Sequence, residues 1–326
     1  MHYITMVTKI LSYKPLQITL SAFIILGALI CIFTPNYFLF KMGASFAVHI
    51  MIGYLLLAMV FLFFRQPQLM FTSFACCAGL CLFLKHSSNA ELALPPQTSD
   101  KVVKVAHFNM SASDEDYDQT IASILATNAD LISVQEVTPD WHELLKTALQ
   151  EQYPHSNAIV RFDPFGIAVY SKYPFQQIDT LFHEDIPSLV GTIQTEGEGS
   201  AVHFISAHTT PPLFSSAYNK MKAHLTMLGQ YAQHIDLPII TLGDFHAPPW
   251  WGEIQELKEV AQLQDSRRSA TYSFSDVFQN PVDYILYSTE LTCIDFRAVL
   301  SNSNHLGIQG VYQFHSNPQY ASKANR

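Results

Sequence analysis

The first 85 residues contain no Asp or Glu and hold three long apolar runs, which restricts what this part of the chain can become. Because a helix that crosses a bilayer needs about 20 apolar residues, the second run is long enough and the other two are slightly short. A cleaved signal peptide fits less well, because no small-x-small cleavage site follows the first run. The sequence therefore predicts a three-helix membrane anchor over residues 1–85 that contacts the lipid bilayer through residues 16–84. The runs are Leu16 to Phe33, Gly43 to Phe64 and about Pro67 to Leu84.

The five basic residues of this region set the expected orientation. Lys9, Lys14 and Arg65 fall on one side of the predicted spans, and Lys41 and Lys85 fall on the other. Basic residues in short loops favour the cytoplasmic side. The asymmetry is small, and it favours an N-terminus inside and a C-terminal part exported across the membrane.

Charge separates the two parts of the chain. Residues 86–326 hold 13 of the 18 Lys and Arg residues and all 27 Asp and Glu residues, a net charge of −14. Proteins that bind nucleic acid usually carry a basic surface against the phosphate backbone. The acidic balance disfavours duplex DNA as a substrate and favours a small molecule or a lipid head group.

Residues 86–326 are predicted to form a linker, residues 86–100, followed by one α/β domain, residues 101–326. The linker is polar and rich in Ser and Pro. Ser113 and Asp116 form a capping box before one helix, Thr138-Pro139 opens a second, and a third is expected over Ser215 to His234. Strands alternating with helices indicate sheets whose faces are covered by helices. The expected strands begin near Val102, Leu131, Gly166, Gly191, Val202, Ile239, Val282, Cys293 and Gly307.

Polar residues follow several of these strands at the point where the apolar run stops. The run Ile239-Ile240-Thr241-Leu242 ends in Gly243-Asp244, before a Pro-rich turn. A buried strand that ends in this way places a carboxylate at a sheet edge, where loops carry chemistry. Similar endings occur at Asn109, Glu136 and His208, while Asp283 lies at the start of an expected strand and Ser303-Asn304-His305 lies between two of them.

Six segments, taken in order, resemble the endonuclease/exonuclease/phosphatase superfamily, and with its helical anchor the chain is similar to a membrane-anchored bacterial subgroup. The resemblance implies a four-layer α/β sandwich, two packed mixed sheets flanked by helices, and a multi-pass protein of the bacterial inner (cytoplasmic) membrane. It also implies a metal-dependent phosphoesterase. The segments are Ala106-His107-Phe108-Asn109, Val134-Gln135-Glu136-Val137, Gly166 to Pro174, Ser206-Ala207-His208-Thr209, Gly243-Asp244-Phe245-His246, and Pro281-Val282-Asp283-Tyr284 with Ser303-Asn304-His305.

The resemblance implies a role for each matching residue. Glu136 would be the main ligand of Mg²⁺ or Mn²⁺, supported by Asn109 and Asn304, because Mg²⁺ prefers oxygen ligands from one or two carboxylates. Asp244 would orient or deprotonate the attacking water. His208 and His305 would donate hydrogen bonds to the phosphoryl oxygens, and Asp283 would hold His305 in the required tautomer.

Three positions depart from the family pattern. His246 stands where the family usually has Asn, Asn304 stands where it has Asp before the final His, and Tyr284 replaces a His common in this subgroup. His246 can still donate to a phosphate oxygen, and we expect it to bind substrate. Loss of one transition-state donor costs on the order of a hundredfold to a thousandfold in rate. We therefore expect an altered or weakened phosphoesterase, with an extracytoplasmic nuclease and a pseudoenzyme that binds a partner as the alternatives.

Overall fold

The structure is a computed structural model that describes residues 2–34, 37–87, 95–98, 101–110, 116–195, 200–267, 281–301 and 304–315. The chain divides into two compact units. The first consists mainly of the N-terminal helices within Met1–Ala90, joined by the short segment Ala247–Gly252. The second contains the sheets, and each unit is described by itself.

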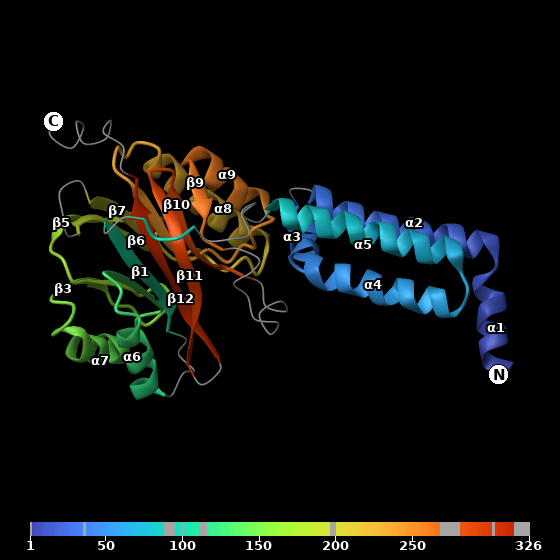
Figure 1. Cartoon of the computed structure of the whole chain (residues 1–326), viewed down its shortest axis with the longest axis horizontal. Coiled ribbons are helices and arrows are strands. Elements are labelled where there is room, and N and C mark those ends of the chain that lie inside the picture. The colour runs from blue at the N-terminus through green and yellow to red at the C-terminus, as the bar shows by residue number, and fades with distance from the viewer. Residues whose placement is uncertain are drawn as a thin grey trace. The chain divides into compact units, whose positions relative to one another are not determined.

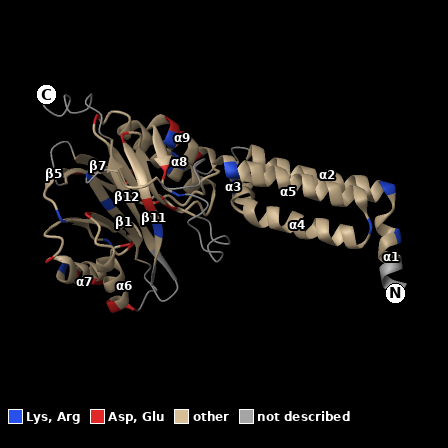
Figure 2. Cartoon of the chain, in the orientation of Figure 1, with Lys and Arg blue, Asp and Glu red and all other residues tan. Residues whose placement is uncertain are grey.

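The first unit is helical over all three predicted apolar runs (Figure 1). Helices α2 and α5 are each long and apolar enough to cross a membrane, and α3 with α4, bent by 60°, makes a third candidate if the pair forms one span. The helices carry very few charged residues (Figure 2). The short helix α1 was not expected from the sequence. The helices are α1 (His2–Leu11), α2 (Lys14–Phe33), α3 (Phe38–Ser45), α4 (Ala47–Phe63) and α5 (Pro67–Ser87).

The second unit contains two six-stranded sheets, each mixed in strand direction. The first has the order β11 (Leu291–Ser301), β12 (Asn304–Phe314), β1 (Val102–Asn109), β2 (Leu131–Gln135), β4 (Ile167–Ser171) and β3 (His155–Ile159). The second has the order β5 (Phe175–His183), β6 (Ile186–Gln194), β7 (Ala201–Ala207), β8 (Ile239–Asp244), β10 (Asp283–Ser288) and β9 (Leu263–Asp265).

Helices cover the outer face of each sheet, which gives the predicted four layers (Figure 1). Helices α6 (Tyr117–Ala126) and α7 (Pro139–Leu149) pack on the first sheet, and α8 (Ser215–Ala232) and α9 (Gly252–Val260) lie on the second. Alternation along the strands explains the layers, since successive side chains point to opposite faces. On β1, Val103 and Val105 belong to the core between the sheets, whereas Ala106 and Phe108 pack toward α6 and α7.

Helix starts confirm part of the local prediction. The side chain of Thr138 accepts a hydrogen bond from the Trp141 amide before Pro139, as expected. Asp116 is itself the N-cap of α6 and accepts from the Gln119 amide, while Ser113 lies outside the described residues. Strands β3, β5 and β9 and helix α9 were not predicted.

Strand direction determines where the polar strand ends meet. Strand β1 runs parallel to β2, and β7 runs parallel to β8, so that each pair ends at the same edge of its sheet. Strand β10 is antiparallel to β8 and pairs Asp283 with Asp244. The carboxyl ends of four inner strands therefore lie beside the start of β10.

Candidate active site

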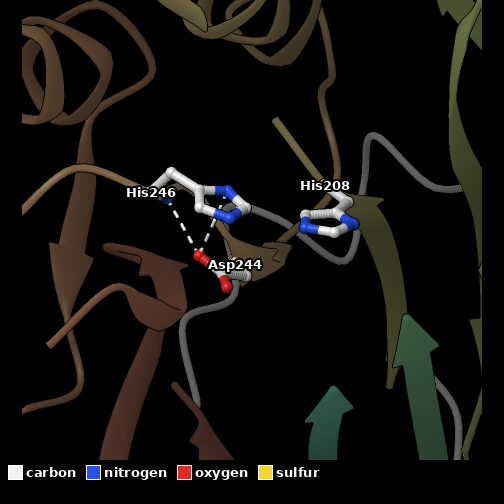
Figure 3. Close-up of side chains that lie close together, drawn as sticks. All are labelled: His208, Asp244 and His246. Atoms are coloured by element: carbon white, nitrogen blue, oxygen red, sulfur yellow. Dashed lines mark hydrogen bonds and ion pairs between the residues drawn. The ribbon is translucent and has the colours of Figure 1, made fainter. Parts of the chain in front are cut away.

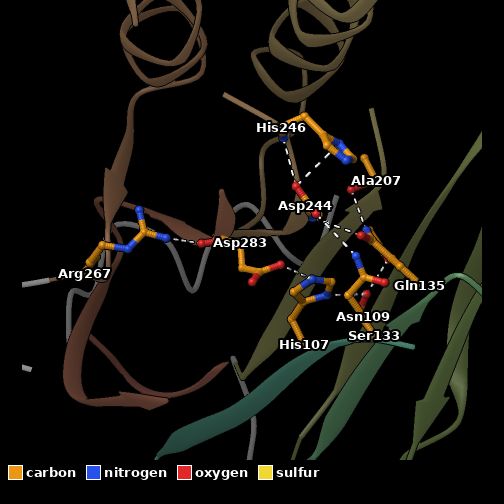
Figure 4. A network of polar contacts seen from close by, with 10 residues as sticks. His107, Asn109, Ser133, Gln135, Ala207, Asp244, His246, Arg267 and Asp283 are labelled. Carbon is orange, nitrogen blue, oxygen red and sulfur yellow. Dashed lines mark hydrogen bonds and ion pairs between the residues drawn. The ribbon is translucent and has the colours of Figure 1, made fainter. Parts of the chain in front are cut away.

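Several of the predicted residues meet where the two sheets end. Asn109 ends β1, Glu136 follows β2, Asp244 ends β8 and Asp283 begins β10. The Asn109 amide Nδ2 donates to Asp244 Oδ2 at 3.3 Å (Figure 4), and the Asn109 side chain also hydrogen-bonds Glu136. Residues more than 130 positions apart thus form one cluster of carboxylates and amides.

The backbone at this edge adopts conformations that most residues avoid. Glu136 has φ +59° and His246 has φ +51°, both in the left-handed region, and Gly243 has φ +151°. A Cβ on Gly243 would lie 1.8 Å from the Ala207 carbonyl oxygen, so the close approach of β7 and β8 excludes any side chain there. Such strain collects at functional sites when the surrounding structure enforces it.

Gln135, the last residue of β2, hydrogen-bonds the first sheet to the second at the site. It is fully buried, its Nε2 donates to the Ala207 carbonyl at 2.6 Å, and its Oε1 accepts from the Asp244 amide at 2.9 Å (Figure 4). The sequence placed Gln135 beside Glu136 but gave it no role. Its position at the end of a buried strand was the available signal.

A second polar residue without a predicted role, His107, lies inside β1. Its Nε2 is 3.3 Å from Asp283 Oδ1, and its Nδ1 is 3.4 Å from the Ser133 hydroxyl (Figure 4). The Ser133 hydroxyl in turn lies 2.6 Å from the Ser206 hydroxyl. Asp283 thus faces His107. The predicted pairing of Asp283 with His305 stays a prediction, because the His305 side chain lies outside the described residues.

The carboxylates repel one another in a partly dry site. Burial raises the pKa of Glu136 most, and the negative charges of Asp244 and Asp283 raise it further, against the lowering effect of the Asn109 hydrogen bond and of His246. Burial likewise raises the pKa of Asp244, with His246 acting in the opposite direction. Burial and mutual repulsion therefore both oppose ionisation of these carboxyl groups, and a positive charge placed between them would counter both effects.

His208 is almost completely buried and is held in one tautomer. Its Nδ1 lies 3.0 Å from the Pro164 carbonyl, which can only accept, so that Nδ1 carries the hydrogen. Burial lowers the pKa of His208 to about 3, so the ring is neutral near pH 7. Its Nε2 is buried with no hydrogen-bond partner among the described residues and offers a lone pair. Donation from His208 to a phosphate oxygen, as expected from the sequence, would require a protonated ring.

His246 lies over His208 and beside Asp244. The two rings stack with centroids 5.0 Å apart, and His246 Nδ1 is 3.5 Å from Asp244 Oδ1. One potential ligand atom from each of His208, Asp244 and His246 lies within 4.8 Å of the other two (Figure 3). The sequence did not predict this grouping, because His208 and His246 were each expected to donate a hydrogen bond to phosphate separately.

The last predicted site residues, Asn304 and His305, lie on the strand next to β1. Asn304 and His305 begin β12, which runs antiparallel to β1 and pairs Gly307 with Phe108, one residue before Asn109. Their side chains lie outside the described residues. Tyr284, the third departure from the family pattern, is fully buried between the Phe245 ring and the Arg267 guanidinium. Tyr284 therefore packs in the interior beside the site.

The fold and the site define a class: a four-layer sandwich whose inner strands end in a cluster of carboxylates, amides and imidazoles suited to phosphoester chemistry. The model of the endonuclease/exonuclease/phosphatase family matches residues 106–305, and the chain belongs to this family. Its members are generally hydrolytic phosphoesterases that depend on a divalent metal. None of the curated proteins compared with the sequence matches it.

Solved structures share the fold at low sequence identity. A family protein from Bacteroides thetaiotaomicron has a TM-score of 0.54 and 14% identity over 66% of this chain and 99% of its own. TDP2 from D. rerio, complexed with a single-strand DNA product, has a TM-score of 0.53 and 13% identity over 66% and 100%. ANGEL2, a 2',3'-cyclic phosphatase bound to adenosine-2',3'-vanadate, has a TM-score of 0.52 and 15% identity over 65% and 96%.

Proposed function

We propose that the chain is a membrane-anchored, divalent-metal-dependent phosphoesterase whose site is built on Glu136, Asn109 and Asp244. The observation that carries the proposal is the convergence of these residues at the ends of β2, β1 and β8, with Asn109 hydrogen-bonded to both carboxylates. Each came from a separate sequence segment, and nothing but the fold brings them together.

The residues fit a hard divalent cation. Asn109 Oδ1 is buried with no hydrogen-bond partner in the described part of the chain, so an amide oxygen has a lone pair to offer. The raised pKa of Glu136, caused by burial and by neighbouring carboxylates, would be offset by a positive charge. Glu136 and Asn109 would hold Mg²⁺ or Mn²⁺, with Asn304 as a further predicted ligand. When bound, the cation would neutralise charge that grows on the phosphoryl oxygens.

Asp244 is the residue that acts on water in this proposal. The Gln135 hydrogen bond to its amide and the Asn109 hydrogen bond to its Oδ2 fix the carboxylate at the end of β8. Burial raises the pKa of Asp244 toward the range where a carboxylate accepts a proton readily. Asp244 would take a proton from water as its oxygen attacks phosphorus, and the ester oxygen would leave as the phosphorus–oxygen bond breaks. His305 and His246 are the proposed donors to the phosphoryl oxygens.

We propose a lipid phosphoester as the substrate, because two loops next to His208 each carry a large exposed apolar side chain. Phe162 is 93% exposed and Leu213 is 77% exposed. Phe162 belongs to the loop whose Pro164 carbonyl and Phe165 ring contact His208, and Leu213 lies in the loop that follows His208. Exposed apolar groups beside a site favour an apolar partner. The apolar helices of the first unit and the net charge of −14 after residue 85 support a membrane lipid over duplex DNA.

We also propose that the sheet-containing unit lies outside the cytoplasm of a bacterial cell, with the N-terminus inside. The argument is the distribution of basic residues around three spans, which places the chain ends on opposite sides. Reporters fused after Arg326 test this orientation, with one enzyme that is active only outside and one fluorescent protein that folds only inside. A signal from the cytoplasmic reporter alone would contradict the proposal and would make intracellular nucleotides candidate substrates.

Metal-dependent hydrolysis by the full chain in detergent micelles tests the activity. We expect turnover of a bis-aryl phosphodiester only with added Mg²⁺ or Mn²⁺, and we expect Glu136→Gln to abolish it. Glu143→Gln, which changes an exposed Glu on α7, is the matched control and should retain full activity. Metal-independent turnover, or full activity in Glu136→Gln, would refute the assignment. No turnover with any metal or phosphoester would favour the pseudoenzyme.

The substrate class is tested by comparing a bilayer substrate with a water-soluble one. Phe162→Ser and Leu213→Ser should slow hydrolysis of phospholipid in mixed micelles, while turnover of the bis-aryl phosphodiester stays unchanged. Leu144→Ser, on α7, removes a partly exposed apolar side chain away from these loops and serves as the control. Equal losses on both substrates would argue against a lipid-binding role, and preferential cleavage of single-stranded DNA would favour the nuclease.

A further inference from the structure

We propose that His208, Asp244 and His246 form a second cation subsite that selects a nitrogen-binding transition ion such as Zn²⁺ or Co²⁺. One potential ligand atom from each residue lies within 4.8 Å of the others, and the three side chains lie close together (Figure 3). Two imidazoles and one carboxylate are a ligand set that suits transition metals, whereas Mg²⁺ favours oxygen alone. The inference deepens the proposed function, because it shares Asp244 with that site.

The hydrogen bonds of His208 prepare it as a ligand. Its Nδ1 donates to the Pro164 carbonyl at 3.0 Å, which leaves the lone pair on Nε2. His208 is only 1% exposed, so this nitrogen is shielded from water. It also has no hydrogen-bond partner among the residues that the structure describes. Metal-binding histidines typically donate their other ring nitrogen to a carbonyl or carboxylate in this way. Leaving such a nitrogen unpaired would otherwise be unfavourable.

His246 supplies a second nitrogen at the same point. Its Nδ1 is buried, forms no hydrogen bond within the described ranges, and lies 3.5 Å from Asp244 Oδ1. Its backbone amide donates to the same oxygen at 2.9 Å, which fixes the carboxylate against the ring. The left-handed backbone at His246, with φ +51°, turns the chain so that the ring stacks on His208.

The two oxygens of Asp244 face different groups. Oδ2 accepts from Asn109, which also hydrogen-bonds Glu136, and Oδ1 accepts from the His246 amide. Oδ1 can therefore bind an ion held by the two histidines, while Oδ2 stays available to accept the proton from water in the proposed reaction.

The residue at position 246 decides the chemistry of the second subsite. The family usually has Asn there, whose amide oxygen is a hard ligand, and this chain has an imidazole. If His246 acted only as a hydrogen-bond donor to phosphate, the chain would bind one class of cation. If it is a ligand, the chain binds a transition ion at this subsite independently of Mg²⁺.

Cobalt binding to the full chain in detergent micelles tests the proposal without an activity assay. We expect Co²⁺ to give visible absorption bands whose titration endpoint corresponds to a tightly bound ion, and excess Mg²⁺ to leave these bands in place. His246→Asn should weaken Co²⁺ and Zn²⁺ binding at least about tenfold, since even supporting contacts to metal ligands are worth about 10- to 100-fold in affinity. The exposed His234 provides the control variant His234→Asn, which should bind as the parent does.

Glu136→Gln separates this proposal from the proposed function. It should weaken Mg²⁺ binding measured by equilibrium dialysis while the Co²⁺ bands persist. Unchanged Co²⁺ affinity in both His246→Asn and His208→Gln would overturn the subsite. Displacement of Co²⁺ by millimolar Mg²⁺ would also overturn it, because a single oxygen-rich site would then explain both ions. Failure of phosphodiester turnover with intact Co²⁺ binding would refute the activity and leave the subsite standing.

Discussion

Gln135 is the residue whose removal should do the most damage to the site without touching a reacting atom. Gln135→Met keeps the length of the side chain and removes both polar groups. Two buried partners, the Ala207 carbonyl and the Asp244 amide, then lose hydrogen bonds of 2.6 Å and 2.9 Å. Each buried group left unsatisfied costs about 1–3 kcal/mol, so we expect the free energy of unfolding to fall by about 2–6 kcal/mol.

Phosphodiester turnover by Gln135→Met should fall by more than the loss of folded protein accounts for. The Gln135 hydrogen bond holds the backbone that carries the Asp244 carboxylate, and a misplacement of about 1 Å can cost on the order of a hundredfold in rate. Urea unfolding of the full chain in micelles measures the first effect. Metal-dependent phosphodiester turnover, normalised to the folded fraction, measures the second. Because the role is one of positioning, kcat should fall while KM changes little.

Gln309 provides a matched control for Gln135. It is 3% exposed, its Nε2 donates to the Thr127 carbonyl at 2.9 Å, and its Oε1 accepts from Arg297. Gln309→Met should lower stability by a similar amount but leave turnover per folded molecule unchanged. If Gln135→Met keeps full turnover, or if both variants lose activity equally, the two hydrogen bonds of Gln135 have no specific role in placing Asp244.

Two further predictions concern backbone strain and acid stability. Gly243→Ala should destroy turnover and lower the melting temperature, because the new Cβ would lie 1.8 Å from the Ala207 carbonyl oxygen; an active, stable variant would contradict the close approach of β7 and β8. Burial lowers the pKa of His224 to about 3, below its unfolded value near 6.5, so the stability it contributes is present above pH 6.5 and is lost as the pH falls. Between pH 7 and pH 5 this single group accounts for a loss of about 2 kcal/mol. His224→Gln, which can keep the Ser188 hydrogen bond, should reduce the loss measured by urea unfolding by that amount, and an unchanged pH profile would show that His224 titrates normally.

The sequence predicted the site best where a buried strand ends in a polar residue. Asn109, Glu136 and Asp244 each follow an apolar run, and parallel pairing of β1 with β2 and of β7 with β8 brings such ends together. The structure brings these three residues together, and their positions were visible in the sequence because a buried apolar strand that stops at a polar residue is a local pattern. Thr138 was equally visible, since an N-cap is a local property of a few neighbouring residues.

The missed features depend on long-range packing. His107 lies in the middle of β1, where nothing local distinguishes a polar residue that will meet Asp283 from one that faces solvent. Strand β5 has an irregular pattern of partly buried and exposed side chains because it forms the edge of its sheet, and its sequence does not alternate cleanly. Gln135 acquires its role from Ala207 and Asp244, both on the other sheet.

His246 gives the clearest example of a substitution whose meaning changes once the fold is known. In the sequence it is the loss of a family Asn, and loss of a donor predicts weaker catalysis. The structure places it in the left-handed region, which Asn and His both tolerate better than most residues, so the turn after β8 accepts either side chain. The ring then stacks on His208 with a nitrogen beside Asp244. The substitution therefore preserves the backbone while it exchanges an amide for an imidazole, and the property most directly altered is which cation the site can hold.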